Sequence, residues 1–394
     1  MIDYASVLNP TVAEMKPSGI RKFFDIAATM DDVISLGVGE PDFQTPWAIR
    51  KTGIASLERG KTKYTSNSGI LRLREEICVY LNRKYGLSYD PATEVLLSVG
   101  GSEAIDCAIR ALVSAGDEVI IPQPSYVCYE PITALAGGVP VIIETKAEDD
   151  FKLTVNDLRA AITPRTKAII LPYPCNPTGA IMEKRDLEAI ADLIRDTNII
   201  VISDEIYSEL TFGQRHVSPA TIEGMSERTI TINGFSKTFS MTGWRLGYAC
   251  GPKELIRQMT KIHQFAIMCA PTTSQYAAIE AMHSCDEAVA DMIEEYNHRR
   301  RLVVSMLNDA GFACREPKGA FYAFPSIRAS GLFSDEFCER LLLEEHVAVV
   351  PGTAFGRGGE GFVRISYCYS KEHLIEAIGR METFLGKIKH GMVG

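Results

Sequence analysis

Short, fully apolar stretches alternate with amphipathic ones along most of the chain. The apolar stretches have the length of buried strands, and they lie at 95–98, 118–121, 167–171, 199–203, 229–233 and 246–249. Between them, segments such as 102–113 and 186–195 carry apolar residues on one helical face, as Ile105, Ile109 and Leu112 do. Strands that are apolar on both sides and alternate with helices predict an α/β fold. Its mainly parallel sheet would be covered by helices on both faces.

Residues suited to bind a ligand follow four of these predicted strands. Gly100 and Gly101 precede a helix, whose first backbone N–H groups can bind an anion. Asn176 stands between two prolines in "PYPCNPTG", and Asp204 directly follows "IIVIS". Lys237 comes shortly after the strand "TITI". Because ligands of such folds bind beyond the carboxyl ends of the strands, we expect these residues to meet in one site.

Each of these residues has an ordinary structural explanation when it is taken alone, such as a turn glycine or a solvated lysine. Together they match the needs of one cofactor. Pyridoxal phosphate requires a lysine for a Schiff base, a carboxylate against its ring nitrogen and an anion site for its phosphate. A phenol such as Tyr207 and an amide can hold its 3′-oxygen. The sequence therefore predicts a pyridoxal-phosphate site around Lys237.

Motifs along nearly the whole chain resemble those of the class I and II (aspartate aminotransferase-like) fold-type I pyridoxal-phosphate aminotransferases. In order, they are "ISLGVGEPDF" (34–43), "KYTSNSGILRLREEI" (63–77), "PCNPTG", "SDEIY", "NGFSKTFSMTGWRLGY", "PKGAFYAFP" (317–325), "VPGTAFG" (350–356) and "GFVRISY" (361–367). The likeness is greatest to aromatic-amino-acid and N-acetyl-diaminopimelate aminotransferases. It implies a mainly parallel seven-stranded sheet in a large domain and a smaller α+β domain.

The resemblance also implies how the chain is divided. The N-terminal segment 1–45 would form part of the small domain, residues 46–285 the large cofactor-binding domain, and residues 286–394 the C-terminal small domain. A long helix over about 286–310 would join the two domains. Tyr64 resembles a tyrosine that reaches the phosphate in the neighbouring subunit, which implies a homodimer with shared active sites.

The resemblance to the family also implies which residues contact the cofactor ring. Lys237 resembles the Schiff-base lysine, and Asp204 resembles the acid that pairs with the ring nitrogen. Tyr207 and Asn176 resemble the two contacts of the 3′-oxygen, and Tyr126 in "PQPSY" the aromatic residue that stacks on the ring.

The phosphate group has its own set of residues in the family. Many relatives also have a serine three residues before the lysine, where this chain has Gly234, so that contact is expected to be missing or replaced. The remaining matches are Gly101, Ser102, Glu103, Ser236 and Arg245.

Arg364 in "FVRIS" resembles the arginine that binds the α-carboxylate of the substrate, with Gly39 and Asn176 beside it. An arginine suits this role because its planar fork meets a carboxylate with two hydrogen bonds. The reaction implied is ping-pong transamination between an L-amino acid and a 2-oxo acid such as 2-oxoglutarate. Lys237 would be its general base.

The side chain of the substrate is expected to be aromatic or large and apolar. Some aspartate-selective relatives have a lysine after the paired glycines, where this chain has Ser102. A second carboxylate would lack a cationic partner there. Ile20, Tyr126 and Phe321 are the candidate walls. Aspartate and N-acetyl-diaminopimelate remain alternative donors.

The composition narrows the choice of partners. The 394 residues carry a net charge of −9, which argues against nucleic acid or an anionic membrane. No apolar run approaches the roughly 20 residues that span a bilayer, and the N-terminus lacks the layout of a signal peptide. The ten cysteines form no C-x-x-C pair, so we expect reduced thiols, no metal site and a cytoplasmic location.

Three rival functions share parts of this pattern. A pyridoxal-phosphate β-lyase would use the same fold and most of the same residues. A regulator with an aminotransferase-like sensor domain would need a DNA-binding segment before the motifs, which begin by residue 36. A nicotinamide dehydrogenase would explain the α/β pattern but neither Lys237 nor the absence of G-x-G-x-x-G.

Overall fold

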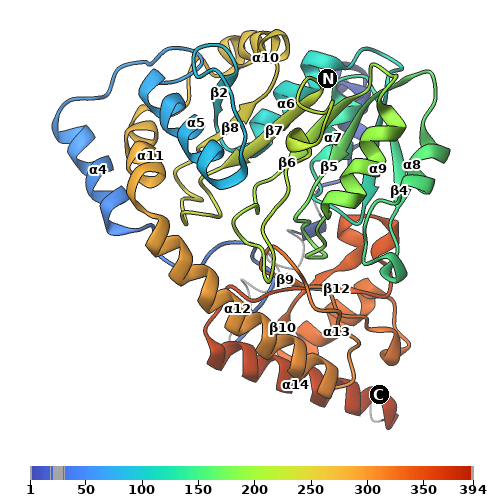
Figure 1. Ribbon diagram of the computed structural model, residues 1–394. Helices are drawn as coiled ribbons and strands as arrows, with labels where there is room; N and C mark the ends of the chain where they lie inside the picture. The colour runs from blue at the N-terminus through green and yellow to red at the C-terminus, as the bar shows by residue number, and fades with distance from the viewer. Residues whose placement is uncertain (1, 18, 21–29, 31, 392–394) are drawn as a thin grey trace.

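The computed structural model describes residues 2–17, 19–20, 30 and 32–391 of the chain (Figure 1). A seven-stranded sheet forms its centre, in the order β2-β8-β7-β6-β5-β3-β4. The strands are β2 (Val95–Ser98), β3 (Glu118–Gln123), β4 (Val139–Glu144), β5 (Thr166–Leu171), β6 (Ile200–Asp204), β7 (Thr229–Gly234) and β8 (Gly247–Cys250). Only β8 runs antiparallel to its neighbours, which confirms the expected α/β fold with a mainly parallel sheet.

Helices cover both faces of this sheet because alternate strand residues point to opposite sides. Ala168 and Ile170 of β5 pack with the helices of one face, whereas Ile169 and Leu171 pack with those of the other. The first face carries α6 (Gly101–Leu112), α7 (Tyr129–Leu135) and α10 (Lys253–Ala266). The second carries α4 (Trp47–Glu58), α5 (Leu71–Tyr85), α8 (Val155–Ala161), α9 (Lys184–Ile194) and α11 (Thr272–Ser284).

A second, smaller group of elements has its own core. It contains an antiparallel sheet of β9 (Tyr322–Ala323), β11 (Val350–Pro351) and β12 (Val363–Ser366), and the helices α13 (Ser334–Glu345) and α14 (Lys371–Lys389). Strand β1 (Ile34–Ser35) of the N-terminal segment pairs with β10 (Val347–Ala348), so segments far apart in the sequence meet here. The long helix α12 (Asp286–Asp309) extends from the large sheet region to this group (Figure 1).

The two short helices α1 (Tyr4–Val7) and α2 (Pro10–Glu14) precede these elements. No helix within the described ranges is both long and apolar enough to cross a membrane.

Candidate active site

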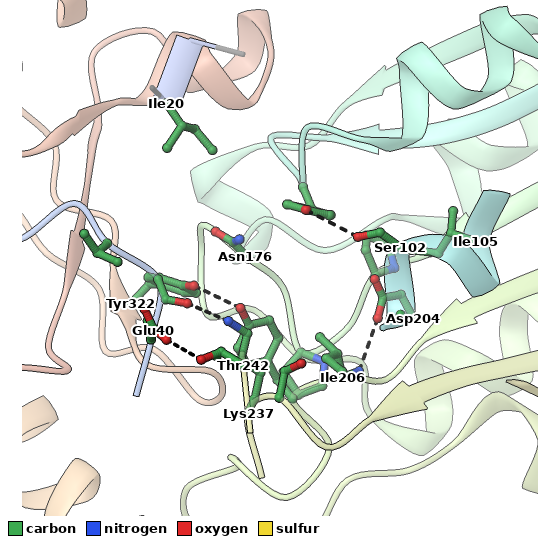
Figure 2. Close-up of a pocket in the computed structure, with 18 of the residues that line it drawn as sticks. Ile20, Glu40, Ser102, Ile105, Asn176, Asp204, Ile206, Lys237, Thr242 and Tyr322 are labelled. Carbon is green, nitrogen blue, oxygen red and sulfur yellow. Dashed lines mark hydrogen bonds between the residues drawn. The ribbon is translucent and has the colours of Figure 1, made fainter. Parts of the chain in front are cut away.

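A cavity of about 380 Å³ lies where the carboxyl ends of the strands meet the smaller group of elements (Figure 2). The ends of β5, β6 and β7 form one wall, and segment 37–40 with residues of β9 and β12 forms the other. The structure brings together here most of the predicted site residues: Gly39, Gly101, Ser102, Tyr126, Asn176, Asp204, Tyr207, Ser236, Lys237, Arg245 and Arg364. Residues far apart in the sequence thus share one cavity.

Lys237 lies near the middle of this cavity, three residues after the end of β7. Its Nζ donates a hydrogen bond to the Gly39 carbonyl oxygen, at 2.5 Å. The pKa of Lys237 is lowered to about 8, mainly by burial. The nearby Arg364 and Arg245 contribute to this shift, whereas Cys368 and Glu40 oppose it. A lysine with this pKa is partly neutral near physiological pH and can act as a nucleophile or a base.

Asp204 is a buried carboxylate at the end of β6, with 7% of its surface exposed. Its Oδ2 accepts a hydrogen bond from the Tyr129 hydroxyl at 2.7 Å. Its Oδ1 accepts one from the Ile206 N–H at 3.2 Å (Figure 2). Burial raises the pKa of Asp204, and the hydrogen bond from Tyr129 opposes this shift. No described cation forms an ion pair with it, so the carboxylate is free for a cationic ligand.

Arg364 is the most buried charge of the cavity, with 2% of its surface exposed. The guanidinium lies between the rings of Tyr322 and Phe355, at 4.5 and 4.8 Å from their centroids. Its Nη1 donates to Asn176 Oδ1 at 2.9 Å, and its Nη2 donates to the Gly37 carbonyl. It forms no ion pair with any described residue, and its Nε has no hydrogen-bond partner there. This cation is held rigidly without a counter-ion, which suits an anionic ligand.

The opposite end of the cavity forms a cradle of backbone and arginine. Gly100 adopts φ +77° just before α6, and a Cβ there would lie 2.7 Å from Arg245 Nη2. Arg245 itself has φ +53°, and its Nη1 donates to the Thr242 carbonyl at 3.0 Å. The first N–H groups of α6 have no partner within the helix. This end can therefore bind a phosphate.

Two glycines explain how tightly this cradle is packed. A Cβ at Gly247 would lie 2.6 Å from the Gly100 carbonyl carbon. A Cβ at Gly234 would lie 3.0 Å from Ile206 Cδ1 and 3.2 Å from the Gly247 Cα. A side chain at Gly234 would therefore require these neighbours to shift by a few tenths of an ångström.

These features fit pyridoxal phosphate. The cradle suits its phosphate, the unpaired Asp204 suits a protonated ring nitrogen, and Lys237 suits its aldehyde. The hydroxyls of Tyr207 and Tyr322 lie 2.9 Å apart beside Lys237. No group of three or more potential metal ligands occurs among the described residues.

Glu103 is predicted to bind the phosphate through its backbone N–H. Its side chain does not line the cavity, because it accepts hydrogen bonds from the Val99 N–H and from buried His263 at 2.7 Å. Two other predicted residues, Tyr64 and Phe321, lie elsewhere. Tyr64 is 82% exposed and lines a separate surface pocket, so one chain alone does not bring it to the site. Phe321 was predicted as a wall of the cavity, and this is wrong.

Phe321 is fully buried and packs behind the cavity, with its ring centroid 5.6 Å from Lys237 Nζ. Tyr322, the next residue and the first of β9, lines the cavity instead. The other two predicted walls, Ile20 and Tyr126, do line it.

The sequence interpretation also missed Tyr129. It stands three residues after Tyr126, and its hydroxyl reaches Asp204. The short distance in sequence between the two tyrosines was the only signal for it.

Comparison with known proteins gives a consistent result. The family model "Aminotransferase class I and II" matches residues 31–381. The putative aminotransferase YugH of Bacillus subtilis is 52% identical over 97% of this chain and 99% of its own length. An aspartate aminotransferase of Pyrococcus abyssi is 48% identical over 95% and 97%. The crystal structure of an aromatic aminotransferase from Pyrococcus horikoshii superposes with a TM-score of 0.89 at 47% identity, covering 93% of this chain and 99% of that one.

Proposed function

Because the chain belongs to the class I and II aminotransferases, we propose that it transfers the amino group of a large apolar or aromatic L-amino acid to a 2-oxo acid such as 2-oxoglutarate. Its cofactor is pyridoxal phosphate. The observation that supports a carboxylate substrate most strongly is Arg364, a buried cation with no counter-ion in the described structure. The substrate α-carboxylate would supply the missing charge.

Each residue of the cavity has a proposed task. Arg245, Ser236 and the backbone of Gly101, Ser102 and Glu103 hold the cofactor phosphate, and Tyr126 stacks on the ring. Asp204 holds a proton on the ring nitrogen, while Tyr207 and Asn176 contact the 3′-oxygen. When bound, the cofactor supplies an aldehyde that takes up the amino group and a ring that accepts electrons from the substrate Cα.

The substrate is positioned by the other end of the cavity. Arg364, Asn176 and the Gly39 backbone bind the α-carboxylate and so place the Cα near Lys237. Lys237 then removes the Cα proton, which its lowered pKa of about 8 permits near neutral pH. Arg364 can bind only one α-carboxylate at a time. Donor and acceptor therefore use the same site in turn, as a ping-pong mechanism requires.

The proposed side-chain preference rests on the cations of the cavity. Those among the described lining residues are Lys237, Arg245 and Arg364, and each already has a task. Ser102, Ile105 and Ile20 offer no charge to a distal carboxylate, which would be buried without a partner. Aspartate and N-acetyl-diaminopimelate remain the alternative amino donors, because relatives of this chain are named as aminotransferases of these compounds.

A panel of amino donors with 2-oxoglutarate tests this preference. We expect kcat/KM for phenylalanine or tyrosine to exceed that for aspartate. An apolar pocket distinguishes side chains by only about 1–3 kcal/mol per methylene, so a broad range should be accepted. A preference for aspartate of about tenfold or more, equivalent to about 1.4 kcal/mol, would show that another cation reads its side chain.

We also propose a cytoplasmic homodimer with shared sites, built from a large domain (46–285) and a small domain (1–45 and 286–394). The exposed Tyr64 would complete the phosphate site of the partner. Mixing inactive Tyr64→Phe and Lys237→Ala proteins should restore activity, because one site of each hybrid dimer carries neither lesion. Inactive hybrids after complete subunit exchange, or an active monomer, would contradict the shared site.

A further inference from the structure

The buried carboxylate of Asp204 accepts a hydrogen bond from one side chain. The Tyr129 hydroxyl, 2.7 Å from Oδ2, is the only described side-chain group that donates to this carboxylate. The other donor is the backbone N–H of Ile206, at 3.2 Å. Burial and the neighbouring Glu205 both raise the pKa of Asp204, so each disfavours the anion.

Tyr129 is built into the structure in a way that fixes its hydroxyl. It is the first residue of α7 and 2% exposed, and its ring meets the Tyr126 ring edge to face at 5.9 Å. Its own carbonyl accepts a hydrogen bond from Thr133 Oγ1, one turn later in α7. Burial raises the pKa of Tyr129 well above its usual value, so the phenol stays protonated and can only donate to the carboxylate.

We propose that Tyr129 is a positioning residue that keeps Asp204 ionised and orients it toward the ring nitrogen of the cofactor. This inference rests on the proposed role of Asp204. Tyr129 occupies one lone-pair direction of Oδ2 and Ile206 N–H one of Oδ1, which leaves the remaining directions toward the cavity. The same ring supports Tyr126, so Tyr129 connects the carboxylate with the aromatic residue proposed to stack on the cofactor.

The test compares two ligands of the cofactor-free protein. One is pyridoxal 5′-phosphate, and the other is the analogue in which carbon replaces the ring nitrogen. Both carry the same phosphate and aldehyde, so the ratio of their dissociation constants isolates the contact between Asp204 and the ring nitrogen. Because both are measured on the same preparation, a fraction of misfolded protein cancels from the ratio.

The variant Tyr129→Phe should reduce the preference for the natural cofactor by about three- to tenfold, since a hydrogen bond to a buried charge is lost. Tyr173→Phe is the matched control. Its phenol is equally buried but contacts only the backbone of Leu153 and Phe151, so the ratio should not change. If Tyr129→Phe weakens both ligands equally, or neither, Tyr129 serves packing alone and the inference is wrong.

A second pair of variants separates this inference from the proposed function. Asp204→Asn should abolish the preference, and adding Tyr129→Phe to it should cause no further change in the ratio. If Asp204→Asn retains the preference, the assigned role of Asp204 fails, and with it the role of Tyr129. If only Tyr129→Phe is without effect, the role of Asp204 stands and that of Tyr129 fails.

Discussion

Two arginines at opposite ends of the cavity, each proposed to bind an anion, lie in different surroundings. Arg364 is 2% exposed, stacked between two rings and fixed by Asn176 and Gly37. Arg245 is exposed, adopts a left-handed backbone conformation and lies against Gly100. Both lack an acidic partner among the described residues, but only Arg364 lies in surroundings that exclude water.

This difference in burial between the two arginines indicates what each end of the cavity is suited to bind. A substrate enters and leaves in every cycle, so its arginine must be rigid beforehand to avoid an ordering cost each time. A cofactor remains bound, and its phosphate can gather an exposed arginine together with the N–H groups of α6. Lys237 lies between the two ends, so a cofactor held at one end and a substrate held at the other should both reach it.

The largest expected effect comes from removing Lys237. The variant Lys237→Ala leaves both arginines intact, so it should still bind cofactor and amino acid. Its turnover should fall by about 10²–10⁴-fold, because general acid–base catalysis contributes that much. Steady-state kinetics measures the loss, and titration with the cofactor serves as the control. Turnover within about threefold of the parent protein would remove Lys237 from the reaction.

The rate at which cofactor-free protein reacts with pyridoxal phosphate should rise about tenfold per pH unit below the pKa of the same lysine. Only its neutral form can attack the cofactor aldehyde. Because its pKa in the folded protein is lowered to about 8, the neutral fraction rises as pH increases toward that value and then levels off. Stopped-flow absorbance of cofactor-free protein mixed with pyridoxal phosphate should show this dependence. A rate independent of pH over that range would mean that Lys237 is neutral throughout.

The smallest effect concerns the packing of the phosphate end. Gly234→Ser would place Cβ 3.0 Å from Ile206 Cδ1, so the free energy of unfolding should fall by about 1–3 kcal/mol. Adding Ile206→Val removes the Cδ1 atom and should restore part of the loss. Denaturant unfolding of the cofactor-free proteins measures both values. Unchanged stability in the single variant would show that the space around Gly234 accommodates a side chain.

The two ends also differ in how well the sequence predicts them. At the phosphate end, the strand pattern predicted Gly100 and Gly101 before a helix, and the family motif supplied Arg245. The carboxylate end joins residues far apart in the sequence, such as Gly37, Asn176 and Arg364. Its cation could be named from the family motif, but its neighbours depend on long-range packing.

The wrong prediction for Phe321 and the omission of Tyr129 have the same origin. Telling Tyr322 from Phe321 as the wall required the position of a two-residue strand that begins at Tyr322, and no periodic pattern reveals so short an element. Tyr129 was missed because its partner, Asp204, is 75 residues away. Both depend on which side chains meet across the sheet edge, whereas the sheet itself follows from local hydrophobic pattern.

One matched pair of substitutions tests the central claim most directly. Arg245→Lys and Arg364→Lys each keep the positive charge but lose the planar fork. We expect Arg245→Lys to weaken pyridoxal phosphate binding by about tenfold and to leave kcat/KM for the amino acid within about threefold at saturating cofactor. Arg364→Lys should do the reverse, lowering kcat/KM by about 10–100-fold with cofactor affinity unchanged. If both variants change the same quantity, the two ends do not bind different anions and the account is wrong.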